Sequence, residues 1–238
     1  MFGLDDKYKL NKKIEVKTFI KKEFNVSDKK RLKESLKNVT LVYQLVGEDI
    51  PSIINEEYNC QVILFLDIEI NNIKNASFVG GIIQSEIKSL CIMKIHDKNT
   101  QRYYFAEKRL NLQDNNNVII ENIVITKESS IFFFDDWVER LEEYLKFSNI
   151  ILKENKLFFY REMMTKAFII SELNFDLEGN KLLESNLWYN SRRVKEVLIN
   201  LKEIEKLKLQ LKKIKDVKEK VSVNKEIKNL NEKIMKSV

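Results

Sequence analysis

The C-terminal segment is the part of the sequence that most restricts its own conformation. From Ser191 to Val238 there is neither glycine nor proline, the two residues that most often interrupt a helix. Apolar residues recur every three or four positions, as in a coiled-coil seam, at Val194, Val197, Leu201, Ile204, Leu207, Leu211, Ile214 and Val217. An unbroken helix of this length would span roughly 70 Å. We therefore expect residues 191–238 to form a long helical, coiled-coil-like extension that projects, folds back as a hairpin or pairs with another chain.

One place in this extension departs from the repeat. The apolar pattern falters at Val221-Ser222-Val223-Asn224 and resumes with Ile227, Leu230 and Ile234. Ser222 and Asn224 are residue types that favour the N-cap of a helix. A second helix, if there is one, is expected to begin there.

The first 190 residues predict an α+β domain. The most regular strand pattern is Gln61–Ile70, where one face is aliphatic throughout and the other turns from apolar to Asp67 and Glu69. Leu90–Ile95 and Thr100–Leu110 are joined by a short turn, which is typical of a hairpin. Further strands are expected at Thr40–Val46, Val118–Thr126 and Ser130–Phe134, and helices at Val16–Glu23, Ser27–Lys37, Ala76–Ile87 and from Asp135 onward. The fold class is α+β with a mainly antiparallel sheet and packed helices.

Charge is distributed unevenly along the chain. Residues 1–40 have a net charge of +6, residues 41–191 of −8, and residues 192–238 of +8. An acidic middle between basic ends indicates that the ends contact a polyanion or an acidic partner. Only seven of the 42 basic residues are arginine, which leaves few side chains for bidentate recognition of bases or phosphates.

The composition excludes several classes of protein. The single histidine, His96, is incompatible with a two-histidine metal centre and lies in a predicted turn, as a surface histidine would. Neither a GxxxxGK[ST] nor a GxGxxG phosphate-binding loop occurs. Cys60 and Cys91 lack CxxC spacing, the N-terminus shows no signal segment, and no apolar run approaches the ~20 residues of a membrane span. We expect a reduced, cytoplasmic protein without cofactors.

The extension carries the best candidate for a binding surface. Seven lysines in the fifteen residues from Lys206 to Lys220 are accompanied by only two acidic residues. The candidate nucleic-acid-binding residues are Arg192, Arg193, Lys206, Lys208, Lys212, Lys213, Lys215, Lys218 and Lys220. On a helix these side chains lie beside the apolar seam, where they would contact phosphates. A coiled coil with solvated lysines is the alternative; membrane binding is disfavoured because the apolar face has no Trp or Phe.

Carboxylates suggest one alternative with catalytic chemistry. A metal-dependent nuclease of the restriction-endonuclease type needs an Asp and a Glu that hold Mg²⁺ and a lysine near the attacking water. Asp67, Glu69, Glu86 and Lys88 approach this pattern. Because Glu86 and Lys88 fall near a predicted helix end, we interpret Asp67 and Glu69 as the solvated end of a strand. No metal ligand or catalytic residue is assigned.

Two aromatic runs, Tyr103-Tyr104-Phe105 and Phe132-Phe133-Phe134, lie in predicted strands. Such clusters can stack on the bases of single-stranded nucleic acids. Adjacent aromatic residues in strands more often pack in the core, so we expect both runs there. Trp137 is expected to anchor the helix that begins at Asp135.

Several segments, taken in order, carry a resemblance to a known family. They are Asn11-Lys12-Lys13-Ile14, the strand Gln61–Ile70, the hairpin of Leu90–Ile95 and Thr100–Leu110, the block Phe132–Trp137 and the tail phrase Lys218–Ile227. Over nearly the whole chain they resemble the uncharacterised bacterial family catalogued as domain of unknown function 4391, although Ile87–Met93 lacks a proline that the family usually has before that strand. The resemblance supplies no catalytic residue. It implies a setting, because genes for such proteins are often found beside helicases and DNA methyltransferases in restriction-like, anti-phage clusters.

These observations lead to one hypothesis and two alternatives. The hypothesis is a non-catalytic accessory subunit of an anti-phage, restriction-like system, with an α+β domain at residues 1–190 and a basic helical extension at residues 191–238. The domain would dock on a helicase or DNA methyltransferase partner, and the extension would contact the nucleic-acid backbone. The alternatives are the metal-dependent nuclease and a homodimer assembled through the extension.

Overall fold

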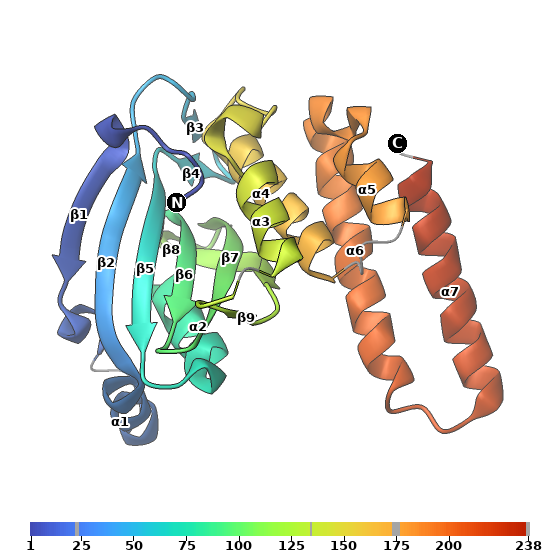
Figure 1. Ribbon diagram of the computed structural model, residues 1–238, viewed down its shortest axis with the longest axis horizontal. Coiled ribbons are helices and arrows are strands. Elements are labelled where there is room, and N and C mark those ends of the chain that lie inside the picture. Colours follow the sequence, from blue (N-terminus) through green and yellow to red (C-terminus); the bar gives the residue numbers. More distant parts are fainter. Residues whose placement is uncertain (22–23, 134, 173–176, 237–238) are drawn as a thin grey trace. The chain divides into compact units, whose positions relative to one another are not determined.

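The computed structural model describes residues 1–21, 24–133, 135–172 and 177–236 (Figure 1). The chain divides into two compact units, Met1–Glu172 and Leu173–Val238. The second unit includes α5 (Leu177–Leu183) and a 3-10 turn, Asn186–Tyr189, in addition to the extension that the sequence placed from residue 191.

The first unit is built on one sheet. Its strands are β1 (Lys9–Ile14), β2 (Leu36–Leu45), β5 (Ile63–Ile70), β6 (Leu90–His96), β7 (Thr100–Asn111) and β8 (Asp114–Ile125), which lie in this order, and β9 (Ser129–Ser130), which pairs with β7. Among the described strands, β5 and β6 are the one parallel pair of this sheet (Figure 1). The two-residue strands β3 (Ile53–Ile54) and β4 (Asn59–Cys60) pair separately. The predicted α+β class with a mainly antiparallel sheet is confirmed.

The helices of the first unit are α1 (Val26–Ser35), α2 (Ala76–Glu86), α3 (Asp136–Tyr144) and α4 (Lys156–Glu172), with 3-10 turns at Asp6–Tyr8, Val16–Phe19, Ile73–Asn75 and Phe147–Asn149. α2 crosses from the end of β5 to the start of β6, which is what allows these two strands to run parallel. The predicted helix Val16–Glu23 is only a 3-10 turn as far as it is described, since residues 22 and 23 lie outside the described residues. The predicted helix Ser27–Lys37 ends earlier, because Leu36 pairs with Ile70 at the start of β2.

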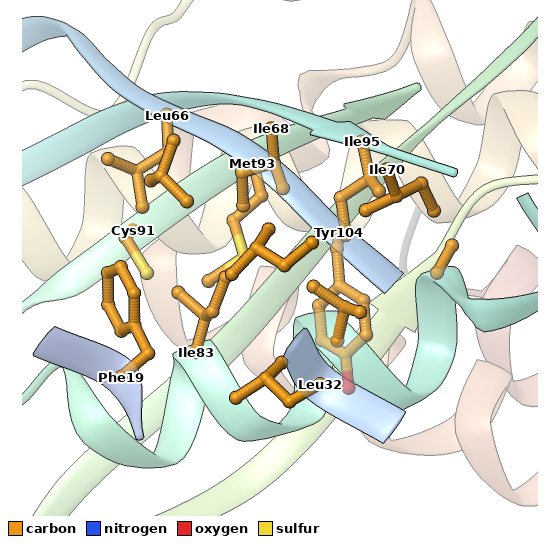
Figure 2. Close-up of a cluster of buried hydrophobic side chains, with 14 of the residues drawn as sticks. Phe19, Leu32, Leu66, Ile68, Ile70, Ile83, Cys91, Met93, Ile95 and Tyr104 are labelled. Carbon is orange, nitrogen blue, oxygen red and sulfur yellow. The ribbon is translucent and has the colours of Figure 1, made fainter. Parts of the chain in front are cut away.

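One face of the sheet packs against α1 and α2 in a continuous apolar core. β5 and β6 contribute alternate residues to it, as the period-two pattern predicts. Figure 2 shows how these side chains converge: Leu66, Ile68 and Ile70 from β5, Cys91, Met93 and Ile95 from β6, Tyr104 from β7, and Phe19, Leu32 and Ile83 from the helical segments. The predicted burial of the central strand is confirmed.

The two glycines of α2 do not break this helix. At Gly80 an added Cβ would lie 2.4 Å from Cδ2 of Tyr104, so the glycine allows the helix to approach the ring closely. At Gly81 the nearest atom to such a Cβ, the Tyr104 hydroxyl oxygen, is 3.8 Å away. The first glycine is therefore required by packing and the second is not.

The opposite face of the sheet changes character along β5. Ile63 and Phe65 are buried, whereas Asp67 and Glu69 keep about a third of their side chains exposed. α4 lies against β7 and β8 on the covered part, where Tyr160 donates a hydrogen bond to the Cys91 carbonyl oxygen at 2.9 Å. The polar half of this face stays open to solvent on β5, as the sequence predicts.

The second unit ends in a helical hairpin. α6 (Ser191–Leu211) and α7 (Val217–Met235) pack along each other and are joined by residues 212–216 (Figure 1). A single long coiled-coil helix is therefore not formed; the chain folds back, which was one of the three expected arrangements.

The break in the helix lies at residues 212–216 and not at Ser222–Asn224, which are inside α7. Asp216 is the N-cap of α7, and its side chain accepts a hydrogen bond from the Glu219 amide at 2.9 Å. A carboxylate at this position also interacts favourably with the positive end of the helix dipole. The aspartate thus defines the start of α7 more strongly than the serine or asparagine that the sequence analysis favoured.

Candidate functional site

The end of the hairpin where α6 meets α7 brings together most of the predicted lysines. We call residues 208–220 the lysine tip. Its lysines are all exposed: Lys208, Lys212, Lys213, Lys215, Lys218 and Lys220. The acidic residues of the tip are Asp216, which caps α7, and Glu219. Six lysines against two carboxylates leave a concentrated positive surface.

Local hydrogen bonds give the tip a defined backbone. The amide of Lys213 donates to the Gln210 carbonyl oxygen at 2.8 Å, and the Ile214 amide donates to the same oxygen at 3.2 Å. Together with the Asp216 cap, these bonds close the connection between the two helices. The lysines are thus presented on an ordered turn.

Three of the predicted nucleic-acid-binding residues lie elsewhere or are already engaged. Arg192 and Arg193 are at the opposite end of α6, about 30 Å from Lys212 at 1.5 Å per helical residue, and Arg192 pairs with Glu196 at 3.2 Å. Lys206 pairs with Glu203 at 3.1 Å. The structure therefore brings six of the nine predicted residues together and leaves these three outside the tip.

Net charge is concentrated in the unit that carries the tip. Residues 173–238 contain 16 basic and 10 acidic residues, whereas residues 1–172 contain 26 of each. The formal charge of +6 therefore belongs to the second unit. A polyanion would be attracted to that unit rather than to the molecule as a whole.

The lysine tip also exposes aliphatic side chains. Leu209, Val217 and the adjoining Val221 are 54, 73 and 63% exposed. The apolar seam of α6 is buried through Leu207, and the exposed Val217 marks its end. The tip is thus a mixed surface in which aliphatic groups lie between ammonium groups.

His96 is placed differently from its prediction as a surface turn residue. It is the last residue of β6, its side chain is 25% exposed, and its Nε2 lies 2.9 Å from Oδ1 of Asp67. Its Nδ1 lies 3.2 Å from the Asp97 carbonyl oxygen. Both ring nitrogens thus face acceptors, which favours the doubly protonated imidazolium. The hydrogen bond with Asp67 raises the pKa of His96, so this histidine is an ion-pair partner and not a free base.

Glu69 is likewise paired across the sheet. Its carboxylate accepts hydrogen bonds from the Asn38 amide at 2.9 Å and from Lys37 Nζ at 3.2 Å. The bond with Asn38, followed by that with Lys37, lowers the pKa of Glu69. Asp67 and Glu69 are therefore half-buried members of two cross-strand pairs rather than the solvated strand end that we expected.

The four residues of the nuclease alternative are not brought together. Glu86 ends α2 and pairs with Lys21 at 2.6 Å. Ile63 is in register with Leu90, so the segment before β6 lies beside the first residues of β5, whereas Asp67 is four residues, or about 13 Å, further along. Within the described residues no group of three His, Cys, Asp or Glu side chains is arranged to hold a metal ion.

The two aromatic runs have different environments. Tyr103, Tyr104 and Phe105 are buried, as predicted, but Phe132 and Phe133 are 67 and 76% exposed. The prediction of a core position is wrong for these two because the strand stops at Ser130, before the aromatic run begins. Phe134 lies outside the described residues. The serine pair before the run and the aspartate pair after it were the available signs of a surface turn.

Comparison with known proteins gives one match. Residues 2–234 match the family described as domain of unknown function (DUF4391). The chain belongs to this family. No curated protein and no solved structure matches it significantly.

Membership of DUF4391 confirms the resemblance seen in the sequence and brings no catalytic residue with it. Candidate residues of this DUF4391 protein must therefore be argued from its own geometry. The described helices include none that is both long and apolar enough to cross a bilayer.

Proposed function

We propose that this DUF4391 protein is a non-catalytic accessory subunit of a restriction-like, anti-phage defence system in the cytoplasm. It would dock on a helicase or DNA methyltransferase partner and contact the nucleic-acid backbone through the lysine tip. The convergence of six exposed lysines on one ordered turn is the observation that carries the contact with nucleic acid. The defence setting rests on the gene neighbourhood that the family resemblance implies.

The chemistry of the tip favours contact with phosphates over recognition of bases. An ammonium group is a point charge without the planar fork that reads guanine or grips a phosphate bidentately. The tip contains lysine and no arginine. Binding through it would be independent of sequence and strongly dependent on salt, because each neutralised phosphate releases condensed counterions.

The homodimer alternative has lost part of its basis. It required the apolar seam of the extension to be available for another chain. Val194, Val197, Leu201, Ile204 and Leu207 are each at most 4% exposed. An open seam is therefore not what the second unit offers to a partner.

The test is the binding of a fluorescent DNA duplex measured by anisotropy over a series of salt concentrations. The tip variant carries Lys212→Gln, Lys213→Gln and Lys215→Gln. The control carries Lys29→Gln, Lys30→Gln and Lys33→Gln on α1, which removes the same charge from the first unit. The salt dependence is expected to weaken by up to about 3 in the slope of log K against log salt for the tip variant, at about 0.9 per phosphate, and to stay unchanged in the control.

Equal losses in both variants would mean that binding follows net charge and not the tip. No binding by the intact protein would remove nucleic acid from the proposal. Incubation of the same duplex with Mg²⁺ or Mn²⁺ tests the nuclease alternative, which requires cleavage.

A further inference from the structure

A second surface, on the first unit, has the opposite character to the lysine tip. It begins with the exposed phenyl rings that follow β9 and continues along the outer side of α3. We call it the acidic–aromatic surface, and its members are Phe132, Phe133, Asp135, Asp136, Glu139, Glu142 and Glu143, all exposed. The proposed function assigns it no role.

The two phenylalanines lie on an anchored backbone. The amides of Phe132 and Phe133 donate to Oγ of Ser130 at 3.1 and 3.3 Å. The amide of Ile131 donates to the Asn99 carbonyl oxygen at 3.0 Å, which ties this turn to the end of β7. An ordered turn that leaves two adjacent phenyl rings mostly in water is typical of a contact surface.

The helix that follows is divided between core and charge. Trp137, Val138 and Leu141 are buried, and the carboxylates occupy the other side. Between residues 132 and 143 there are five acidic residues and one basic residue, Arg140. This negative field repels nucleic acid, so base stacking is a poor use for the exposed rings. The matching partner is cationic and aliphatic.

The lysine tip has this chemistry. It combines an excess of four positive charges with exposed Leu209 and Val217, against an excess of four negative charges beside Phe132 and Phe133. Complementary charge orients such a contact, and burial of the phenyl and aliphatic groups supplies affinity. We propose that the lysine tip of one copy docks on the acidic–aromatic surface of a second copy. Reciprocal docking closes a two-fold dimer.

This dimer occupies the lysines that the proposed function assigns to nucleic acid. Nucleic acid and the second copy therefore compete, and a duplex releases monomers. This consequence rests on the proposed function, whereas the dimer does not.

The experiment is sedimentation velocity of the full chain at low salt, about 50 mM, and at high salt, about 0.5 M, where exposed charges are strongly screened. A dimer is expected at low salt and a monomer at high salt. Phe132→Ser with Phe133→Ser should raise the dimer dissociation constant at least about tenfold. Tyr189→Ser, which removes another exposed aromatic ring (70% exposed), should leave it unchanged. Circular dichroism verifies that each variant is folded.

A charge swap makes the test specific for this pair of surfaces. Glu139→Lys with Glu142→Lys should abolish the dimer, and so should Lys212→Glu with Lys213→Glu. The chain that carries all four changes should recover it. A monomer at every salt concentration, a dimer that ignores the phenylalanine changes, or no recovery in the swapped chain would overturn the proposal.

A DNA duplex added to the dimer separates the two proposals. Release of monomers supports both. A duplex that binds while the dimer persists overturns the shared use of the tip and thereby the docking proposal. A dimer that is sensitive to the swap but binds no duplex leaves the docking intact and removes the proposed function.

Discussion

The pair of His96 and Asp67 links protonation of one residue to the stability of the sheet. Asp67 raises the pKa of His96 above 6.5 in the folded protein. The pair therefore contributes its full stability below pH 6.5 and loses it as the pH rises through the folded pKa. We expect the free energy of unfolding to fall above pH 6.5 by up to about 1 kcal/mol, because both side chains keep contact with water. Urea denaturation at a series of pH values measures this.

Asp67→Asn is the matched control for this prediction. The amide keeps the size of the side chain but removes the negative charge that holds the imidazolium. The fall in stability above pH 6.5 should become shallower in this variant. An identical pH dependence in both proteins would show that His96 is not the titrating group.

The glycine pair of α2 provides a prediction with a built-in comparison. Gly80→Ala forces a Cβ to within 2.4 Å of the Tyr104 ring, and overpacking of this kind costs about 1–3 kcal/mol. Gly81→Ala meets nothing closer than 3.8 Å and should stabilise the helix by about 0.5–1 kcal/mol. The midpoints of urea unfolding should move in opposite directions. Equal destabilisation by both changes would contradict the packing explanation.

At the scale of the element, α4 is held by charges that are out of contact with water. Arg161 donates from Nε to Oε1 of Glu107 at 2.8 Å, and the two side chains are 5 and 0% exposed. Arg161→Met would leave Glu107 with the Asn122 amide at 3.0 Å as its remaining printed side-chain partner. We expect a loss of about 3–5 kcal/mol in unfolding free energy. The double variant Glu107→Leu, Arg161→Met should recover most of it, and failure to recover would mean that the pair is net stabilising.

α4 and the hairpin also show which elements a sequence can predict. β5 and the helical character of α6 were predictable because one side of each is apolar at a fixed period. α4 was not, because Lys156, Arg161, Glu162 and Lys166 give it the polar pattern of a surface helix although all four are buried. Their partners, such as Glu107, are far away in the sequence. The same holds for the candidate site: the lysines were visible as a run, but the turn that gathers them depends on the cap at Asp216.

At the scale of the whole molecule, opposite surfaces are carried by different units. The lysine tip belongs to the second unit, and the acidic–aromatic surface belongs to the first. The sequence showed the basic ends and the acidic middle, yet it did not show that five of the acidic residues would lie beside exposed rings. That depends on the strand β9 ending after two residues, which no periodic pattern indicates.

The two cysteines allow the opening of the molecule to be followed at two depths. Cys60 is in the two-residue strand β4, Cys91 is in the central strand β6, and both are buried. Burial raises the pKa of the Cys60 thiol to about 12 and also raises that of Cys91, so neither forms a reactive thiolate in the folded state. Modification by a disulfide reagent therefore requires opening, and a two-stranded pair opens at a lower free energy than the middle of the sheet. With increasing urea, Cys60 should react first and Cys91 only with global unfolding, as single-cysteine variants would reveal. Equal rates at all urea concentrations would show that β4 opens only when the entire sheet does.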